Sequence, residues 1–413
     1  MRRWRASAAV RTHHRQLTAW PIDRSTIDRG IAEVLRVDVK PELLRWACKR
    51  AGLDAKTLAH TFPKLSAWER GEERPTLKQL ERFASLTHAP LGFLFLDAPP
   101  IETIPIPDLR TVGDRGVAHP SPDLLDTLFL CQQRQEWFRD AARTAGEGPL
   151  PFVGSLRVGS DIVAAGAVMR TALGFDIEER RAMHTWTGAL RRFLQQADDA
   201  GVLVMVNGVV GNNNRRKLRP SEFRGFALSD PLAPLVFING ADSKAAQMFT
   251  LAHELAHVWS GETALSDQGP LMSTENDVER WCNQVAAEFL VPAADFAREL
   301  RAGAPVHDEA QRLARIFKVS TLVVLRRMHD AGVLTRRALG AAFDAELAAI
   351  AASAREPGGD FYLTQAARVG RRFATTLIAS TLEGQTLHRD AMRLLGISRM
   401  STFRELGHSL GVG

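Results

Sequence analysis

The chain has 413 residues, of which 45% are hydrophobic and 24% charged, and its formal net charge is +6. This length predicts two or three domains, and the composition is typical of a globular protein. The sequence contains no apolar run long enough to span a membrane. Its three cysteines, Cys48, Cys131 and Cys282, form neither a disulfide framework nor a CxxC metal motif. We therefore expect a reducing cytoplasm, and the dispersed positive charge permits nucleic-acid contact without requiring it.

The first third of the chain divides into an arm, a helical domain and a connector. Residues 1–36 are basic and contain no apolar stretch of signal-peptide length, so we expect a solvated arm. Residues 37–97 have apolar residues at spacings of three and four, with Gly or Pro at the breaks, which predicts a small all-helical domain. Residues 98–120 are rich in proline, which favours an extended path. This segment should be a domain boundary or a strap lying on the next domain.

The rest of the chain is predicted to contain both helices and strands in its first part and helices in its last part. Residues 121–335 begin with helical sequence and continue with three strand-like segments, "GVLVMVNGVVG", "EFRGFALSD" and "APLVFING". Two helices follow, with "FTLAHELAHVWSG" in the first and "NDVERWCNQVAAEFLVP" in the second. Residues 336–360 resemble a linker, and residues 361–413 are expected to form a helical region that binds a partner. The predicted class is α+β: a small all-α domain, a domain with a short sheet, and a helical C-terminal region.

The stretch from Phe249 to Gly261 places His253 and His257 four residues apart, with Glu254 directly after the first histidine. On a helix the two imidazoles would lie on one face, about one turn apart. Two neutral imidazoles can bind a zinc ion while a carboxylate that is not a ligand takes a proton from water. The alternative is a buried helix that contains two histidines by chance, because HExxH has only three fixed positions.

A third ligand would separate these alternatives. A histidine six residues after His257, as in metzincins, is excluded because that position is Thr263. Glu279 on the next predicted helix would complete a site of two histidines and one glutamate, with one position left for water. Asp277 and Glu288 on the same helix are alternative ligands, and Glu279 could also be an ordinary surface residue.

The two motif helices together resemble the ImmA/IrrE family of zinc peptidases, in which an HExxH helix is followed by E-x-x-(A/C)-N-x-(F/V)-A-A-x-(F/L)-L-(M/V)-P. The resemblance places the metal ligands at His253, His257 and Glu279, and the general base at Glu254. It implies a gluzincin-like fold, one Zn²⁺ per chain and a site-specific endopeptidase that cleaves DNA-binding repressors of mobile elements or stress genes. Segments such as "IPIPDLRT" and "GGDFYLTQAARVGRRFATT" extend the similarity to a long form with an N-terminal XRE-like helix-turn-helix.

The mechanism implied is attack by water, in which Glu254 takes a proton from the water and passes it to the leaving amine. An extended substrate could add as a strand along "PLVFING", which we expect to be a sheet edge. Candidates for stabilising the oxyanion, or for supporting the ligands, are Asn283, His307 and Tyr362, the one tyrosine of the chain. None of them stands out as the oxyanion donor, which argues against high turnover.

The predicted helical domain resembles an XRE-type domain with one departure. Leu58 and Trp68 are ten residues apart, whereas the usual pattern has about fourteen. The missing turn predicts a truncated or tilted recognition helix, with Lys64, Ser66 and Arg70 as the contacts if operator DNA binds. The alternative is a module for helical packing or protein docking.

A second helix-turn-helix spacing occurs at "LARIFKVSTLVVLRRM". Ser320 is expected to cap its second helix. Thr321 and Arg326 would lie on a basic face together with Lys318 and Arg327. The alternative is a helical subdomain that packs under the active site.

The site residues and the family resemblance together imply two alternative functions. The first is a cytoplasmic zinc endopeptidase that cleaves a repressor. The second is a DNA-binding regulator, or the antitoxin of a toxin-antitoxin operon, that uses the peptidase fold to bind its partner with little turnover. The presence of His253, Glu254, His257 and Glu279 together favours metal chemistry, because a scaffold has no need of all four. No membrane partner is expected.

Overall fold

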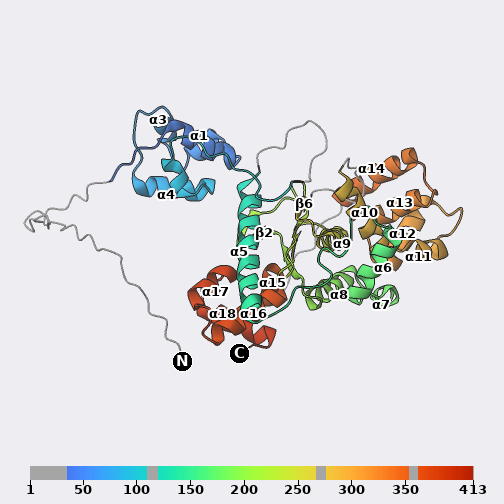
Figure 1. Ribbon diagram of the computed structural model, residues 1–413. Coiled ribbons are helices and arrows are strands. Elements are labelled where there is room, and N and C mark those ends of the chain that lie inside the picture. Colours follow the sequence, from blue (N-terminus) through green and yellow to red (C-terminus); the bar gives the residue numbers. More distant parts are fainter. Residues whose placement is uncertain (1–34, 109–119, 267–275, 353–360, 413) are drawn as a thin grey trace, which may run out of the picture. The chain divides into compact units, whose positions relative to one another are not determined.

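The computed structural model of the chain describes residues 35–108, 120–266, 276–352 and 361–412. They belong to two compact units, Met1–Pro99 and Pro100–Gly413 (Figure 1). The predicted basic arm, residues 1–36, lies almost entirely outside the described residues.

The first unit is helical in its described part. Its elements are α1 (Pro41–Arg50), α2 (Ala55–Ala59), α3 (Leu65–Glu69), α4 (Leu77–Thr87) and the 3-10 helix η2 (Leu91–Phe95). Proline opens α1, where its missing N–H costs nothing, and Thr76 and Gln79 form a capping box at the start of α4. Trp68 and Phe83 are buried in the core. The α3 helix has only 5 residues, as expected from the short spacing in the sequence.

The described part of the second unit contains a four-stranded sheet and a separate hairpin. The sheet has the order β1-β5-β4-β6, and the hairpin pairs β2 with β3. β1 and β5 run parallel, whereas β4 is antiparallel to both β5 and β6. The strands are β1 (Leu203–Asn207), β2 (Val209–Val210), β3 (Asn213–Lys217), β4 (Gly225–Leu228), β5 (Leu235–Asn239) and β6 (Ala264–Ser266). The first predicted strand segment contains both β1 and β2, the second contains β4, and the third contains β5. Strands β3 and β6 were not predicted.

The other regular elements in the described part of this unit are helices. They are α5 (Pro122–Thr144), α6 (Ile162–Leu173), α7 (Ile177–Ala182), α8 (Trp186–Asp199), α9 (Lys244–Ser260), α10 (Asp277–Leu290), α11 (Ala293–Glu299), α12 (Val306–Phe317), α13 (Thr321–Asp330), α14 (Arg336–Ala352), α15 (Phe361–Val369), α16 (Arg371–Leu382), α17 (His388–Leu395) and α18 (Met400–Leu410). Within the described ranges, no helix combines the length and the apolar character that crossing a membrane requires.

The central strands contribute to two apolar cores, because successive residues of a strand face opposite sides of the sheet. Val236 and Ile238 of β5 join the first core, with α6, α8 to α10 and α12 to α14. Leu235 and Phe237 join the second core, with α5 and α15 to α18 (Figure 1). The sheet is therefore the middle layer of three.

The expectation that "PLVFING" forms a sheet edge is wrong. This segment contains β5, which is paired on both sides, with β1 and with β4. Its backbone hydrogen-bonding groups are therefore used inside the sheet, and a substrate strand cannot add to it. Strands buried on both faces are typically continuous apolar runs, and "LVFI" is such a run.

Part of the proline-rich connector lies along the β6 edge of the sheet. Leu265 of β6 donates its backbone N–H to the carbonyl of Pro107 at 3.1 Å, and Asp108 forms a parallel bridge with the same residue. Ile106 is buried in the second core. These contacts make residues 106–108 a strap on the sheet, so β6 does not present a fully open edge either.

The segment predicted to be a linker, residues 336–360, begins as a helix. Residues 336–352 form α14, and its Leu339 and Phe343 are buried in the first core. Alanine-rich sequence has a high helix propensity, so the helix is stable once these two side chains are buried. Residues 353–360 lie outside the described part of the chain.

The helices after residue 360 cover the second face of the sheet together with α5. Arg134 of α5 donates to the carbonyl of Leu394 at 2.9 Å, and Gln365 of α15 donates to the carbonyl of Leu395 at 2.9 Å. The apolar faces of these helices are thus used within the chain. A partner of residues 361–413 would have to bind their outer surface.

Candidate metal centre

The motif helix α9 has well-defined ends. The Ser243 side chain accepts from the backbone N–H of Ala246 at its start, and Gly261 ends it in the left-handed region at φ 80°. Both signals can be read in the sequence. They fix which residues of the HExxH motif lie on a common face.

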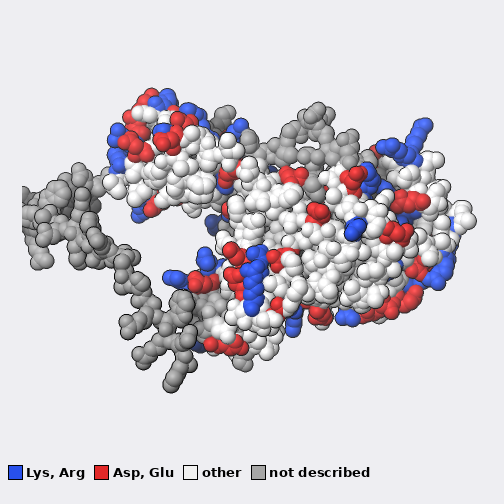
Figure 2. All heavy atoms as spheres, viewed as in Figure 1, with Lys and Arg blue, Asp and Glu red and all other residues white. Residues whose placement is uncertain are grey.

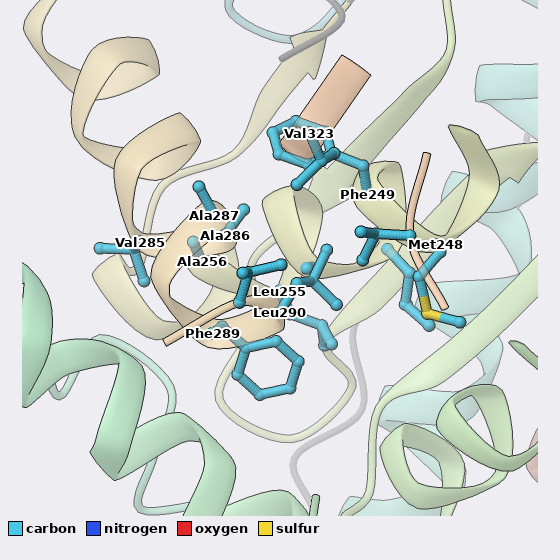
Figure 3. Packing of buried hydrophobic residues seen from close by; sticks show 14 of the residues in the cluster. Met248, Phe249, Leu255, Ala256, Val285, Ala286, Ala287, Phe289, Leu290 and Val323 are labelled. Atoms are coloured by element: carbon cyan, nitrogen blue, oxygen red, sulfur yellow. The ribbon is translucent and has the colours of Figure 1, made fainter. Parts of the chain in front are cut away.

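Apolar packing sets α9 against α10. Figure 3 shows Leu255 and Ala256 of α9 close to Ala286 and Leu290 of α10, within the first core. Close packing of this kind allows little rotation of either helix about its axis. The polar side chains on the facing sides are therefore held in a fixed relation.

Three of these side chains meet between α9 and α10. His253 Nε2 and His257 Nε2 are 3.1 Å apart. They lie 3.2 and 3.1 Å, respectively, from the two carboxylate oxygens of Glu279. All three side chains are buried. Among the described residues, this is the one group of His, Cys, Asp and Glu side chains whose ligand atoms are close enough together to hold a metal ion.

The spacing of these atoms fits a tetrahedral zinc ion. Zinc binds imidazole nitrogen at about 2.0–2.1 Å, so two such nitrogens are about 3.3 Å apart in a tetrahedral site. The observed separation of 3.1 Å is close to this value. Two nitrogen lone pairs that face each other at this distance repel, and a cation or a proton between them removes the repulsion. Two histidines and one glutamate are also a ligand set of catalytic zinc sites.

The structure separates the three acidic candidates for the third ligand. Glu279 faces the histidines. Asp277 is 79% exposed and pairs with Arg280. Glu288 is buried and forms an ion pair with Arg327. Only Glu279 is therefore placed to bind the same ion as His253 and His257.

Burial and the neighbouring charges act in opposite directions on the pKa values of this cluster. Burial lowers the pKa of His253, but Glu279, Glu254 and Asn283 together raise it above its ordinary value. Burial and the adjacent His253 hold the pKa of His257 below its ordinary value in spite of Glu279. Burial raises the pKa of Glu279, but the two neighbouring histidines lower it by more. The pKa of Glu279 is therefore below its ordinary value, and this carboxylate is ionised.

Glu254 is fully buried next to strand β4. A Cβ atom on Gly225 of β4 would lie 2.9 Å from Glu254 Oε1, 2.8 Å from the carbonyl oxygen of Phe237 and 2.7 Å from Thr250 Cγ2. Only glycine permits this close approach of strand and helix. Gly225 was not among the residues predicted for the site, although an isolated glycine in a strand pattern often marks such an approach.

Cys282 is a second residue of the site that was not predicted from its spacing in the sequence. Its Sγ lies 3.6 Å from Nδ1 of His257. Burial raises the pKa of the Cys282 thiol well above its ordinary value, so the sulfur keeps its proton. Its position in the helix, three residues after Glu279, was the signal that could have found it.

Of the three candidates for oxyanion stabilisation or ligand support, Asn283 is the one that lies near a candidate metal ligand, because it contributes to the raised pKa of His253. His307 is exposed on α12, where its Nε2 is 2.9 Å from Gln311 Nε2 and its Nδ1 is 3.8 Å from Glu346. Tyr362 belongs to α15, but its side chain lies outside what the structure describes. Asn283 is therefore placed to support a ligand.

The predicted DNA contacts of the first unit include two ion-paired cations. Lys64 Nζ is 2.7 Å from Glu73, and Arg70 Nε is 2.7 Å from Glu72. Ser66 is exposed on the short α3. The two ion pairs reduce the positive charge that this surface offers to a phosphate backbone. In the second unit, basic and acidic side chains are interspersed on the face seen in Figure 2.

The second helix-turn-helix candidate consists of α12 and α13. Ser320 caps α13, as predicted. The Thr321 hydroxyl donates to Glu346 at 2.5 Å, and Arg326 pairs with Asp330 at 2.9 Å. The three predicted DNA contacts of this segment therefore already have partners within the chain.

Arg327 does not lie on the predicted basic face. It is buried, forms the ion pair with Glu288 and donates to the carbonyl of Val291 at 2.8 Å. Leu313 and Val324 of the same helix pair are buried in the first core. Both helices thus pack in the same core as α9 and α10. This packing favours the interpretation of α12 and α13 as a helical subdomain under the metal centre over that of a DNA-binding helix-turn-helix.

The fold and the site together define a candidate metal centre of the metallopeptidase type. Residues 197–329 match the family model of the IrrE N-terminal-like domain, a peptidase family. Peptidases of this family are zinc-dependent. The matched segment contains α9 and α10 with all three candidate ligands. This match supports the resemblance to the ImmA/IrrE family.

A second family model matches residues 369–409, as a domain of unknown function (DUF8813). This segment contains α16, α17 and most of α18, which cover the second face of the sheet. Neither match includes residues 37–97. A comparison with curated proteins found no match.

Proposed function

We propose that the chain is a zinc-dependent, site-specific endopeptidase with an XRE-like DNA-binding domain, and that it regulates transcription by cleaving a repressor of mobile-element or stress genes. The observation that carries the proposal is the convergence of His253, His257 and Glu279 at 3.1–3.2 Å. The match of residues 197–329 to a peptidase family supports the class of reaction. In this proposal the protein works in the cytoplasm, and its substrate is a protein.

The residues of the site have separate roles in the proposed reaction. His253, His257 and Glu279 hold the zinc ion, and Asn283 supports His253. When bound, zinc supplies a Lewis acid that polarises a carbonyl and lowers the pKa of water. Glu254 takes a proton from the attacking water and passes it to the leaving amine.

The DNA-binding part of the proposal is supported by the helical fold of the first unit and by the exposed Ser66 on α3. Operator DNA would be contacted by Lys64, Ser66 and Arg70. A mobility-shift assay with DNA from upstream of the protein's own coding sequence tests this. Replacement of Ser66 by Glu should abolish a specific shift, and an undiminished shift would contradict this contact.

A regulator with little turnover is the second candidate, because the site is nearly inaccessible. Glu254 and His257 are 0% exposed, and His253 and Glu279 are 2% and 1% exposed. A substrate must reach the zinc for hydrolysis, whereas binding of a partner at the outer surface needs no such access. In this alternative the chain is a DNA-binding regulator, or the antitoxin of a toxin-antitoxin operon whose toxin binds the peptidase fold.

The first experiment is a measurement of metal content by mass spectrometry on the full-length chain, purified without added metal, beside His257→Ala. We expect one zinc ion per chain in the parent and none in the variant. If the parent contains no zinc even after reconstitution, the motif is only a buried helix that contains two histidines.

A second experiment separates the peptidase from the regulator. The zinc-loaded parent and Glu254→Gln are incubated with candidate repressors. Glu254→Gln should keep its zinc and lose cleavage, because it removes the base and leaves the ligands. Cleavage by the variant would reject the role of Glu254. A loaded parent that leaves every repressor intact would favour the regulator.

A further inference from the structure

Cys282 lies behind His257, on the side of the ring that faces away from the metal site. Its Sγ is 3.6 Å from Nδ1 of His257, whereas Nε2 of the same ring faces His253 and Glu279. Cys282 and His257 are both 0% exposed. The sulfur does not belong to the group of atoms that could share one ion. It is therefore a neighbour of a ligand and not itself a ligand.

One face of α10 supplies both a ligand and the groups behind the two histidines. Glu279, Cys282 and Asn283 are three and four residues apart and so lie on the same side of the helix. Asn283 contributes to the raised pKa of His253, and Cys282 contacts His257. A histidine that binds a metal almost always donates its second ring N–H to a fixed acceptor, which sets the orientation of the ring and its tautomer.

A thiol in this place behaves differently from the usual carboxylate or carbonyl acceptor, because it can donate as well as accept. His257 binds a metal through the lone pair of Nε2, which requires a proton on Nδ1, and Sγ can accept that N–H. The other tautomer is also accommodated. Its Nε2–H can donate to Glu279, 3.1 Å away, while the thiol donates to Nδ1.

We propose that Cys282 is the positioning residue for His257, with a thiol that accepts from Nδ1–H when Nε2 binds zinc and donates to Nδ1 when it does not. This inference rests on the proposed zinc site. It adds that the affinity of the site for zinc depends on a residue that does not contact the ion. Loss of the thiol should weaken zinc binding about 10- to 100-fold, as is typical for the loss of a partner behind a metal ligand.

The test compares the full-length parent with Cys282→Ala, Cys282→Val and Cys131→Ala. Valine fills the space of the thiol without a hydrogen-bonding group. Cys131 is another buried cysteine, but it belongs to the second core, so its replacement controls for the loss of buried sulfur. Zinc affinity is measured by competition with a chelator of known affinity. Both Cys282 variants should bind zinc about 10- to 100-fold more weakly, and Cys131→Ala should bind it like the parent.

Zinc affinity equal to that of the parent in either Cys282 variant would overturn the proposal, because packing alone would then be enough to hold the His257 ring in place.

The infrared S–H stretching band gives a readout that a purely structural residue would not change. The Cys282 band, assigned by difference from Cys282→Ala, should shift when zinc is loaded, and an unchanged band would overturn the exchange of donor and acceptor. A parent that binds no zinc would reject the proposed function as well, which distinguishes that failure from failure of this inference alone.

Discussion

Individual side chains on α9 and α10 determine what the centre can bind. Glu279 and Glu288 are both buried glutamates of α10, but one faces two histidines and the other an arginine. This difference makes Glu279 part of the candidate metal site and Glu288 part of an internal ion pair.

Zinc binding should weaken on acidification. Burial lowers the pKa of His253, but Glu279 and Glu254 raise it above the ordinary histidine value. Zinc needs the neutral imidazole, so below this raised pKa a proton competes with the metal, and one displaced proton weakens the apparent affinity about tenfold per pH unit. The apparent zinc affinity, measured at stepped pH by competition with a chelator, should begin to fall at a pH where an ordinary histidine is still neutral. An affinity that stays constant well into the acid range would contradict this.

Gly225→Ala should destabilise the second unit, because its Cβ would meet the carbonyl oxygen of Phe237 and the side chains of Thr250 and Glu254 at 2.7–2.9 Å. Overpacking of this kind costs about 1–3 kcal/mol of unfolding free energy, which urea denaturation measures. Gly340→Ala is the matched control, because no atom lies within 4 Å of its Cβ position and it lies within α14. Equal stability of the two variants would show that a Cβ at residue 225 fits between β4 and Glu254 without a clash.

At the scale of elements, the C-terminal end of α10 is held by arginines from other helices. Arg170 of α6 donates to the carbonyl of Glu288 at 2.7 Å, and Arg327 of α13 donates to that of Val291 at 2.8 Å. Cations at a helix C-terminus are favourable because the last carbonyls lack partners. These contacts fix the end of α10, the helix that carries Glu279, relative to α6 and α13.

Arg327→Ala should therefore be strongly destabilising. It would leave the carboxylate of Glu288 buried without its cation, which costs about 3–5 kcal/mol. The neighbouring Arg326→Ala is the control. It breaks a more exposed pair with Asp330, and such pairs contribute about 1 kcal/mol or less. Thermal or urea unfolding of both variants checks the difference, and similar losses would mean that the buried pair does not anchor α10.

At the scale of the whole chain, residues 361–412 belong to the same compact unit as the metal centre. Leu235 and Phe237 on the second face of the sheet are covered by α5 and α15 to α18. The segment matched as a domain of unknown function is therefore largely a layer of this fold. Its proposed partner-binding role is confined to the outer surface.

A chain that ends at residue 352 should fail to fold its second unit. Truncation would expose the apolar face of the sheet, and large exposed apolar surfaces lead to aggregation. We expect loss of a cooperative thermal transition and of near-ultraviolet circular dichroism. The fragment 100–413, which lacks the whole first unit, is the control and should keep its transition. A soluble, cooperatively folding 1–352 chain would refute the structural role of these helices.

Several features of the fold and of the candidate site could be predicted from local sequence. The spacing in "FTLAHELAHVWSG" indicates a helix with both histidines on one face, and Ser320 before an apolar run indicates a cap. Glu279 could be proposed but not separated from Asp277 and Glu288, because a sequence shows the spacing along a helix and not which face meets another helix.

Local sequence was sufficient to predict the motif helices, most of the strands and the short α3, because hydrophobic periodicity, caps and turn residues act within a few positions. Three features became visible only in the folded chain: β5 is a central strand, Arg327 is buried against Glu288, and residue 225 must be glycine to leave space for Glu254. Each of these depends on segments far apart in the chain, and close packing selects one arrangement from several that the local pattern allows.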